Sequence, residues 1–415
     1  METIVQKFGG TSVGSVERIQ HVANLIIEEY ERGHSIVSVV SAMGKSTDEL
    51  VALANAITEN PSKREMDMLL STGEQVTISL LTMALQAKGY HAISLTGWQA
   101  GITTESVHSS ARITDIHTDR IQSYLAEGTI VIVAGFQGIS VENEITTLGR
   151  GGSDTTAVAL AAALKAKKCD IYTDVTGVYT TDPRVVKDAY KLDEISYDEM
   201  LELANLGAGV LHPRAVEFAK NHNVVLEVRS SMEQENGTIV KGECNMEQQS
   251  IVKGIAFEDN ITRVTIKGLE QGSLSTVFST LAAAHINVDI IIQSITNEGT
   301  VHLSFSIHSN DLRETLEVLE QNQETLHYES VEHENHLAKV SIVGSGMVSN
   351  PGVAANMFTT LKEEDIHIKM VSTSEIKVSV VIDRLHLVTG VEALHQSFMA
   401  KIEPLVQMSH AHQLK

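Results

Sequence analysis

Three glycine-rich segments constrain the fold of this chain more than any other feature of its sequence. They are residues 7–12 (KFGGTS), 149–154 (GRGGSD) and 173–184 (TDVTGVYTTDPR), and an apolar run of the kind that forms a strand leads towards each of them. Open α/β sheets bind ligands at the carboxyl ends of their strands. Glycine lets backbone N–H groups approach phosphate oxygens closely, and a lysine such as Lys7 adds a mobile cation. The pattern therefore indicates a nucleotide-phosphate site.

Two shorter segments imitate other nucleotide motifs. Residues 44–46 (GKS) have the end of a Walker A loop, but Val39 stands where a second glycine is needed. Residues 340–346 (VSIVGSG) imitate a dinucleotide fingerprint, but Ser349 occupies the position of its third glycine or alanine. The Walker A interpretation therefore fails. We interpret residues 340–346 as a strand and turn of the repeat described below, and a nicotinamide site is the weaker alternative.

The composition is that of a globular protein with several domains. A length of 415 residues and a hydrophobic content of 42% are enough for packed cores, and the length predicts roughly three domains. Lys and Arg number 31 against 53 Asp and Glu, so the formal net charge is -22. This charge disfavours binding to nucleic acid or to an anionic membrane. An anionic nucleotide must then be attracted locally, and the candidate cations are Lys7, Arg150 and Arg184.

The two cysteines and the chain start bear on the cellular compartment. Cys169 and Cys244 lie far apart in the sequence, so neither a disulfide framework nor a zinc site is predicted. The amino terminus enters a strand-like run without a secretory pattern, and no apolar run approaches the roughly 20 residues that span a bilayer. We therefore expect a cytoplasmic protein without a membrane partner.

The first part of the chain, residues 1–242, alternates apolar runs with amphipathic helical stretches. This alternation predicts a mostly parallel sheet with helices on both faces. We expect strands at residues 4–8, 35–41, 91–95, 129–136, 170–173 and 224–228, and helices at 16–32, 65–86 and 153–167. The last helix begins at the second glycine-rich loop, so its positive amino end should face the phosphates.

An internal repeat follows a polar segment at residues 242–250. Residues 264–268 (VTIKG) match residues 340–344 (VSIVG), and later positions of the first copy recur about 80 residues on. Each copy has the strand and helix order of a ferredoxin-like fold. We therefore place domains at residues 1–242, 243–335 and 336–415.

Together these segments resemble the aspartate kinases of the amino acid kinase family. The resemblance extends through residues 41–47 (SAMGKST), 71–74 (STGE) and 206–215 (LGAGVLHPRA), and the repeat resembles the paired ACT domains of that family. It implies an amino acid kinase-type α/β sheet sandwiched by helices, followed by two ferredoxin-like α+β regulatory domains. Family members can interleave the two ACT copies, so residues 251–259 could pair with either one.

The resemblance also implies a reaction and its setting. The reaction is ATP-dependent phosphorylation of L-aspartate to 4-phospho-L-aspartate, the first step of lysine, threonine and methionine biosynthesis. Mg²⁺ would accompany the triphosphate, and lysine, threonine or both would act as feedback inhibitors. A homo-oligomer assembled through the ACT domains is expected, and translation from Met246 could yield a separate regulatory subunit.

Phosphoryl transfer requires positioned cations and N–H groups more than covalent chemistry from the protein. Lys7 is therefore predicted to contact the transferred phosphate, and a solvated strand-end lysine is the alternative. The resemblance assigns Asp154 the task of organising Lys7 and the reacting carboxylate or its metal. The acceptor is already a carboxylate at neutral pH, so no strong general base is required.

The substrate residues are assigned by the same resemblance. Arg150 would bind the α-carboxylate, which its planar fork matches, and Glu74 would bind the ammonium. For Glu74 the alternative is a first-turn glutamate that satisfies the helix dipole. The other expected substrate contacts are Ser41, Thr47, Gly151, Gly152 and Ser153, of which Ser41 and Thr47 could equally be cap or turn residues.

The nucleotide site is expected to draw on two of the glycine-rich segments. Tyr179 could equally be a packing residue, and His212, on the last family segment, is interpreted as a loop or packing histidine. The expected nucleotide contacts are Lys7, Phe8, Gly9, Gly10, Thr173, Asp174, Tyr179, Thr180, Thr181, Asp182, Pro183 and Arg184.

The effector site is expected in the repeat, with Asp289 meeting the ammonium of the effector. Strand alternation would put residues 287, 289, 291 and 293 on one face, and the alternative is that this face merely packs the two copies. The expected effector residues are Asn287, Asp289, Gln293, Val353, Ala354, His367, Ile368, Ser374 and Glu375.

Two other functions compete with aspartate phosphorylation as interpretations of this sequence. An amino acid kinase with a glutamate-type acceptor is disfavoured by Glu74, Arg150 and the tandem repeat. A catalytically silent amino-acid sensor is disfavoured because Lys7, Glu74, Arg150 and Asp154 are all present.

Overall fold

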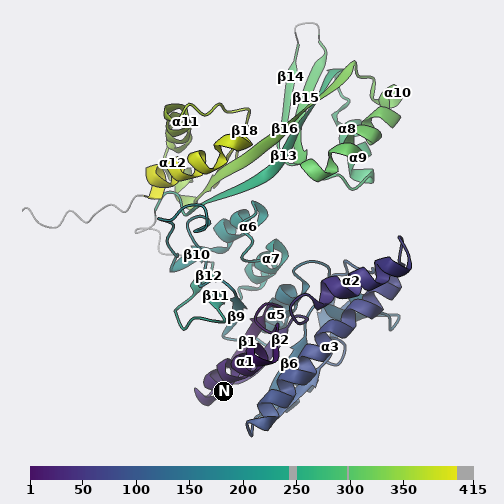
Figure 1. The fold of residues 1–415 in the computed structure, drawn as a ribbon, viewed down its shortest axis with the longest axis vertical. Helices are drawn as coiled ribbons and strands as arrows, with labels where there is room; N and C mark the ends of the chain where they lie inside the picture. The colour runs from purple at the N-terminus through teal and green to yellow at the C-terminus, as the bar shows by residue number, and fades with distance from the viewer. Residues whose placement is uncertain (243–249, 297–298, 400–415) are drawn as a thin grey trace, which may run out of the picture. The chain divides into compact units, whose positions relative to one another are not determined.

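The computed structural model describes residues 1–242, 250–296 and 299–399 (Figure 1). The chain forms two compact units, Met1–Tyr179 with Lys191–Glu247 and Thr180–Tyr190 with Gln248–Lys415. We discuss only their described residues. Cys244, Met246 and most of the polar segment at 242–250 lie outside these residues.

The first unit is built on an eight-stranded sheet of order β10-β12-β11-β9-β1-β2-β6-β3. Neighbouring strands are parallel throughout except for β11 and β12, which confirms the mostly parallel sheet. The strands are β1 (Thr3–Phe8), β2 (Ser35–Val40), β3 (Ala92–Leu95), β6 (Ile130–Ala134), β9 (Lys168–Thr173), β10 (Glu194–Ser196), β11 (Leu226–Ser230) and β12 (Thr238–Lys241).

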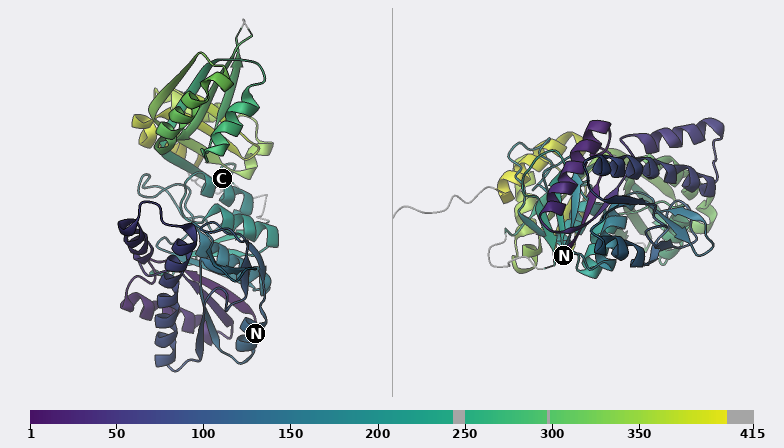
Figure 2. Two further views of the ribbon diagram at one scale, coloured as in Figure 1. Left: turned by 90° about the vertical axis from the view of Figure 1, so that its right-hand side faces the viewer. Right: turned by 90° about the horizontal axis from the view of Figure 1, so that it is seen from below.

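Helices cover this sheet on both faces. Ile4 and Phe8 of β1 belong to a core cluster with residues of two helices, α1 and α3, whereas Val5, on the opposite side of the strand, is also fully buried. Burial on both faces is typical of parallel strands. Figure 2 shows α1 and α3, in purple and blue, alongside the strands. The helices are α1 (Val16–Glu31), α2 (Ser46–Ile57), α3 (Lys63–Ala87), α4 (Asp119–Ala126), α5 (Gly152–Ala163), α6 (Tyr197–Asn205) and α7 (Pro213–His222).

The apolar character of α3 and the end of α5 differ from what the sequence predicted. Among the described residues α3 is the one helix long and apolar enough to cross a membrane, but half of its apolar stretch is buried inside the protein. Its contacts with α1, β3 and β6 are those of a core helix. Helix α5 ends at Ala163 rather than at 167, because Lys165 adopts the left-handed backbone conformation with φ 52°.

A second, four-stranded sheet of order β5-β4-β7-β8 was not expected from the sequence. Its short strands are β4 (Ile102–Thr104), β5 (Ile113–Ile116), β7 (Gln137–Ser140) and β8 (Ile145–Thr147). The second glycine-rich loop therefore follows β8, and β7 and β8 lie between it and β6 in the sequence. Strands of three or four residues rich in Ser and Thr carry too little hydrophobic pattern to be recognised in sequence.

The second unit contains the two repeats around one six-stranded antiparallel sheet of order β14-β15-β13-β16-β18-β17. The first repeat comprises β13 (Gly254–Leu269), α8 (Leu274–Ala283), β14 (Ile291–Ile295), β15 (Val301–His308), α9 (Leu312–Gln321) and α10 (Gln323–Leu326). The second comprises β16 (Ser330–Val343), α11 (Val353–Glu363), β17 (Met370–Thr373), β18 (Lys377–Asp383) and α12 (Leu387–Met399). Short 3₁₀ turns lie at Ser309–Asp311, Ser345–Ser349 and Arg384–His386.

The two long central strands are shared between the repeats. The amino-terminal part of β13 pairs with the carboxyl-terminal part of β16, as in Ile255 opposite Ile342, and the remaining parts pair as in Arg263 opposite Glu334. Residues 254–258 therefore complete the sheet of the second repeat. This pairing decides the alternative left open for residues 251–259, and the expected boundary at residue 336 falls inside β16.

One segment of the second unit comes from the middle of the first unit's sequence. Within Thr180–Tyr190, Val186 belongs to the core cluster of the second repeat together with Val340 and Leu394. The backbone N–H of Ile255 donates to the carbonyl oxygen of Thr180 at 2.7 Å. The chain thus enters the second unit for eleven residues, 180–190, and then returns to the first.

Candidate active site

Lys7 and Asp154 form an ion pair at the carboxyl end of β1. Lys7 is the penultimate residue of β1, Asp154 lies in the first turn of α5, and Lys7 Nζ is 2.6 Å from Asp154 Oδ1. Both side chains are largely shielded, with 12% and 14% exposed. The structure therefore brings together the two residues predicted to be catalytic, which are far apart in the sequence.

The loops that follow β1 and β2 pack tightly together beside this pair. The N–H of Gly44 donates to the carbonyl of Gly10 at 3.0 Å, and a Cβ on Gly10 would lie only 2.9 Å from the carbonyl oxygen of Ala42. Gly44 has a positive φ of 52°. This close approach requires glycine, and it fastens the GGTS segment to the AMGKS segment.

Ser41 and Thr47 flank this turn on either side. The N–H of Ser41 donates to the carbonyl of Phe8 at 3.1 Å, and Thr47 lies in the first turn of α2, whose N-cap is Lys45. Neither hydroxyl is therefore the cap of α2. The ring of Phe8 is buried and stacks on Tyr172 with centroids 4.5 Å apart, so this expected nucleotide residue directs its side chain into the core.

Glu74 has one buried oxygen that lacks a hydrogen-bond partner within the described part of the chain. Its other oxygen accepts from the N–H of Ala42 at 3.2 Å. Glu74 lies in the middle of α3, so its alternative interpretation as a first-turn glutamate was wrong. The preceding Gly73 lets α3 approach closely, since a Cβ there would lie 2.8 Å from Cβ of Ala42.

The electrostatics of Glu74 suit a cationic ligand. Burial raises the pKa of its carboxyl to about 7, although hydrogen bonds from the backbone oppose this shift. A buried carboxylate that lacks a donor is costly. An ammonium group next to the unpartnered oxygen would remove that cost, so the site can bind an amine.

The loop at residues 149–151 turns sharply before α5, which begins at Gly152. Gly149 and Gly151 have φ values of 76° and 67°, and a Cβ on Gly151 would lie 2.1 Å from the ring of His212. Gly152 and Ser153 are buried, whereas Arg150 is exposed. No hydrogen bond or ion pair of Arg150 occurs within the described residues, so its guanidinium is available to a ligand.

Arg214 holds this loop in place and was missed in the sequence analysis. Its guanidinium donates to the carbonyls of Leu148 at 2.8 Å and Ala111 at 2.9 Å. His212 is the N-cap of α7, and burial lowers the pKa of its ring although Asp154 opposes this. His212 is therefore a neutral packing residue, as interpreted from sequence. Arg214 is the one arginine in residues 206–215, a segment that carries the family resemblance, so the sequence could have indicated it.

The third glycine-rich segment is divided between the two units. Thr173 ends β9 with its hydroxyl donating to exposed Asp174 at 3.1 Å, and the Tyr179 hydroxyl lies 2.8 Å from that of Thr176. These residues belong to the first unit, whereas the remaining five expected nucleotide residues belong to the second. Those five are Thr180, Thr181, Asp182, Pro183 and Arg184.

Within the second unit these five residues differ in exposure. Thr180 is fully buried, and Thr181 is nearly so. Arg184 and Asp182 form an ion pair at 2.6 Å, and hydrogen bonds from Arg184 lower the pKa of the Asp182 carboxyl although partial burial opposes this. The hydroxyl of Thr180 is occupied inside the second unit, where it lies 2.9 Å from Nε2 of His395.

Among the expected effector residues, Asp289 already has an ammonium partner in the chain. Lys339 Nζ lies 2.5 Å from Asp289 and 3.1 Å from Glu258, and only 5% of the lysine side chain is exposed. Burial alone would lower the pKa of Lys339, but these two carboxylates outweigh burial and raise it. Any effector ammonium at Asp289 would have to compete with this lysine.

The other expected effector residues fall into two groups. Val353, Ala354 and Ile368 are partly buried and pack against the core of the second repeat itself. Strand β14 starts only at Ile291, and its residues are all exposed, so alternation does not define one face there. The exposed members are Asn287, Gln293, His367, Ser374 and Glu375.

Comparison with known proteins agrees with this architecture. The amino acid kinase family model matches residues 2–230, more than half of the chain, and an ACT domain model matches residues 340–398. The chain therefore belongs to the amino acid kinase family, with an ACT domain following its kinase domain. The relatives most similar to this chain that are described below are aspartokinases.

Two curated relatives and one crystal structure illustrate the similarity. The aspartokinase of Bacillus sp. (strain MGA3) is 69% identical over 400 residues, covering 96% of this chain and 97% of the relative. Aspartokinase 2 of Bacillus subtilis (strain 168) is 67% identical over 406 residues, covering 97% and 99%. The E. coli aspartokinase III structure in complex with aspartate and ADP matches with a TM-score of 0.80 and 28% identity, covering 96% of this chain and 100% of that one.

Proposed function

We propose that this chain transfers the γ-phosphoryl group of ATP to the side-chain carboxylate of L-aspartate, forming 4-phospho-L-aspartate and ADP. The observation that carries this proposal is the buried, unpartnered oxygen of Glu74, which is suited to a substrate ammonium. The aspartokinase names of its relatives support it. We place the reaction in the cytoplasm, as the first step of lysine, threonine and methionine biosynthesis.

The chemistry required of the protein is largely electrostatic. A carboxylate oxygen of aspartate attacks the γ-phosphorus as the bond to the leaving ADP oxygen breaks, and Lys7 would stabilise the charge on the transferred group. Asp154, 2.6 Å from Lys7, holds the lysine in place. Arg150 would bind the α-carboxylate in a bidentate manner. No proton has to be removed from the acceptor.

Mg²⁺ supplies charge neutralisation on the β- and γ-phosphates when it is bound. Within the described residues no group of three or more His, Cys, Asp and Glu side chains could hold an ion by itself. The ion would therefore enter with the triphosphate. Asp154 is suited to bind it, because this carboxylate already lies beside the lysine proposed to contact the phosphate.

Feedback control by lysine, threonine or both is the regulatory part of the proposal. An effector inhibits only if it prefers a conformation in which the kinase domain is less active. The segment Thr180–Tyr190 offers a route, because it begins within the third glycine-rich segment and is packed into the second repeat. A homo-oligomer through the ACT domains is also proposed, since Ile291, Ile292 and Ile295 lie exposed on the edge strand β14.

A steady-state assay of ADP release tests the function. The purified chain should release ADP from Mg²⁺-ATP only when L-aspartate is present. L-Glutamate should be a very poor substrate, because its extra methylene moves the reacting carboxylate away from the γ-phosphate. Comparable kcat/KM values for both amino acids would favour the glutamate-type kinase. Binding of lysine or threonine without any ADP release would favour the silent sensor.

A further inference from the structure

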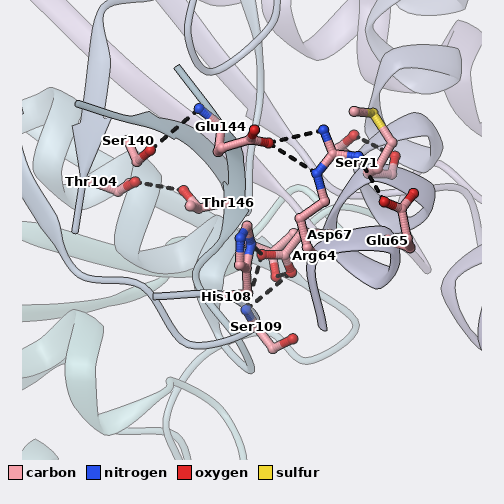
Figure 3. Close-up of polar contacts among 12 residues, drawn as sticks. Arg64, Glu65, Asp67, Ser71, Thr104, His108, Ser109, Ser140, Glu144 and Thr146 are labelled. Atoms are coloured by element: carbon pink, nitrogen blue, oxygen red, sulfur yellow. Dashed lines mark hydrogen bonds and ion pairs between the residues drawn. The ribbon is translucent and has the colours of Figure 1, made fainter. Parts of the chain in front are cut away.

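A fully buried carboxylate, that of Asp67, joins α3 to the loop between β4 and β5 (Figure 3). Its oxygens lie 2.8 Å from Nδ1 of His108 and accept from the backbone N–H of Ser109 at 3.0 and 3.1 Å. The hydroxyl of Thr147, at the end of β8, donates to it at 2.6 Å. A buried carboxylate is stable only with such a set of donors.

The residue held by this carboxylate has a strained backbone. Ser109 has a φ of 69°, in the left-handed region that non-glycine residues rarely adopt. A residue in this conformation persists only where its surroundings impose it, and such residues cluster at ligand-binding sites. The two hydrogen bonds from Ser109 N–H to Asp67 are part of what imposes it here.

The strained Ser109 lies directly against Gly149, at the start of the second glycine-rich loop. A Cβ on Gly149 would be 3.1 Å from the carbonyl oxygen of Ser109. Two residues further on, the N–H of Ala111 donates to the carbonyl of Thr147 at 3.0 Å. The loop at 108–111 and the chain at 147–149 thus form one packed pair, fastened to α3 by Asp67. The next residue along the chain is Arg150.

We infer that Asp67 is a positioning residue for recognition of the amino acid substrate. Through His108 and Ser109 it sets the path of the chain at Gly149 and thereby the place from which Arg150 reaches the α-carboxylate. This inference rests on the proposed function, because it takes Arg150 as the carboxylate ligand. The alternative is that Asp67 only fastens α3 to the small sheet.

A matched control lies one turn earlier on the same helix. Arg64 also joins α3 to the small sheet, through its ion pair with Glu144 at 3.0 Å (Figure 3). This pair is partly exposed, and Glu144 lies in the turn between β7 and β8. Loss of the Arg64 contact therefore removes a tie between helix and sheet without touching the 108–111 loop.

The test compares KM values for the two substrates in folded variants of the full chain. Asp67→Asn keeps the size of the side chain, but its amide NH₂ would face groups that themselves donate hydrogen bonds, such as the N–H of Ser109 and the hydroxyl of Thr147. We expect the aspartate KM to rise about 10- to 100-fold, the scale of a small displacement of a binding group, while the ATP KM stays near that of wild type. His108→Ala should act in the same direction, and His108→Asn, which can donate from its amide, should restore part of the loss. Arg64→Ala should leave both KM values unchanged.

Two results would overturn the inference. One is a folded Asp67→Asn variant with a lowered melting temperature and an unchanged aspartate KM, which is the behaviour of a purely structural tie. The other is an equal rise of both KM values. If Asp67→Asn does not fold, His108→Ala and Thr147→Val, which each remove one contact, must show the same selective rise or the inference fails. Failure of the proposed function would be evident earlier, as a wild-type chain that does not use aspartate.

Discussion

The hydroxyl of Thr180 lies 2.9 Å from Nε2 of His395, and both side chains are buried in the second unit. The same hydroxyl accepts from the N–H of Tyr190 at 3.2 Å, so its own hydrogen is free to be donated to the histidine. Burial lowers the pKa of His395, although Asp188 opposes this, and a neutral ring can accept that hydrogen. A hydrogen bond therefore joins α12 of the second repeat to Thr180, the residue that directly follows Tyr179.

The first prediction concerns this contact. His395→Ala should raise the ATP KM and weaken inhibition by lysine or threonine, with the aspartate KM unchanged. The expected change is about fivefold, the equivalent of one hydrogen bond worth about 1 kcal/mol. Steady-state kinetics on the folded variant measure it, and His386→Ala, an exposed histidine on the preceding turn, is the control. Unaltered ATP KM and inhibition in His395→Ala would exclude the segment as a route of control.

Lys7 is predicted to contribute charge stabilisation without being needed for the fold. Lys7→Ala should lower kcat by roughly two to four decades, the scale of a lost electrostatic contact to the transition state. Thermal unfolding should show that the variant is folded, although Asp154 loses its partner. Near-normal turnover would refute the assignment.

Arg150→Lys tests recognition of the substrate carboxylate. Lysine keeps the charge but loses the planar fork, so the aspartate KM should rise by far more than the ATP KM. The comparison of the two KM values is the measurement. An equal rise of the aspartate KM and the ATP KM would instead place Arg150 at the transferred phosphate, which both substrates contact.

Glu74 predicts a pH dependence of substrate binding. A substrate ammonium pairs with the ionised form of Glu74, whose pKa in the ligand-free protein is about 7. The value of kcat/KM for aspartate should therefore fall as the pH drops below about 7. Glu74→Gln should bind aspartate weakly and lose this dependence. A pH profile identical to wild type in that variant would contradict the role of Glu74.

The same carboxyl affects stability with a definite sign. Because the pKa of Glu74 in the folded protein lies above the ordinary value of 4.5 for a glutamate, the folded protein binds the proton more tightly than the unfolded chain does. The contribution of Glu74 therefore favours folding at low pH and is lost as the pH rises from about 4.5 through about 7. Bound aspartate should reverse this trend by pairing with the ionised group.

Asp289→Ala tests the effector site. We expect it to relieve inhibition by lysine or threonine while the uninhibited kcat stays almost unchanged, because Asp289 is far from the kinase residues in the sequence and lies in the other unit. Lys339 would keep Glu258 as a partner. Full inhibition of the variant at unchanged effector concentration would show that the pocket lies elsewhere in the repeats.

Much of the fold could be predicted because its signals are local. The apolar runs of β1, β2, β6 and β9 and the helical periods of α1 and α3 predicted the parallel sheet, since burial on both faces leaves near-continuous hydrophobic strands. The glycine-rich segments marked the edge where Lys7 lies. The pairing of Lys7 with Asp154 came from resemblance, because nothing local in either segment refers to the other.

The tertiary structure alone decided which distant segments meet. An apolar side chain such as Val186 or Ile255 favours burial, but nothing local shows in which core it is buried. The entry of Thr180–Tyr190 into the second unit and the sharing of β13 and β16 therefore could not be predicted from sequence patterns. The same limit applies to Asp67, Lys339 and Arg214, whose charged side chains have ordinary helical or strand neighbours along the chain. Their partners are brought together by long-range packing, and packing depends on the whole set of buried surfaces rather than on any one segment.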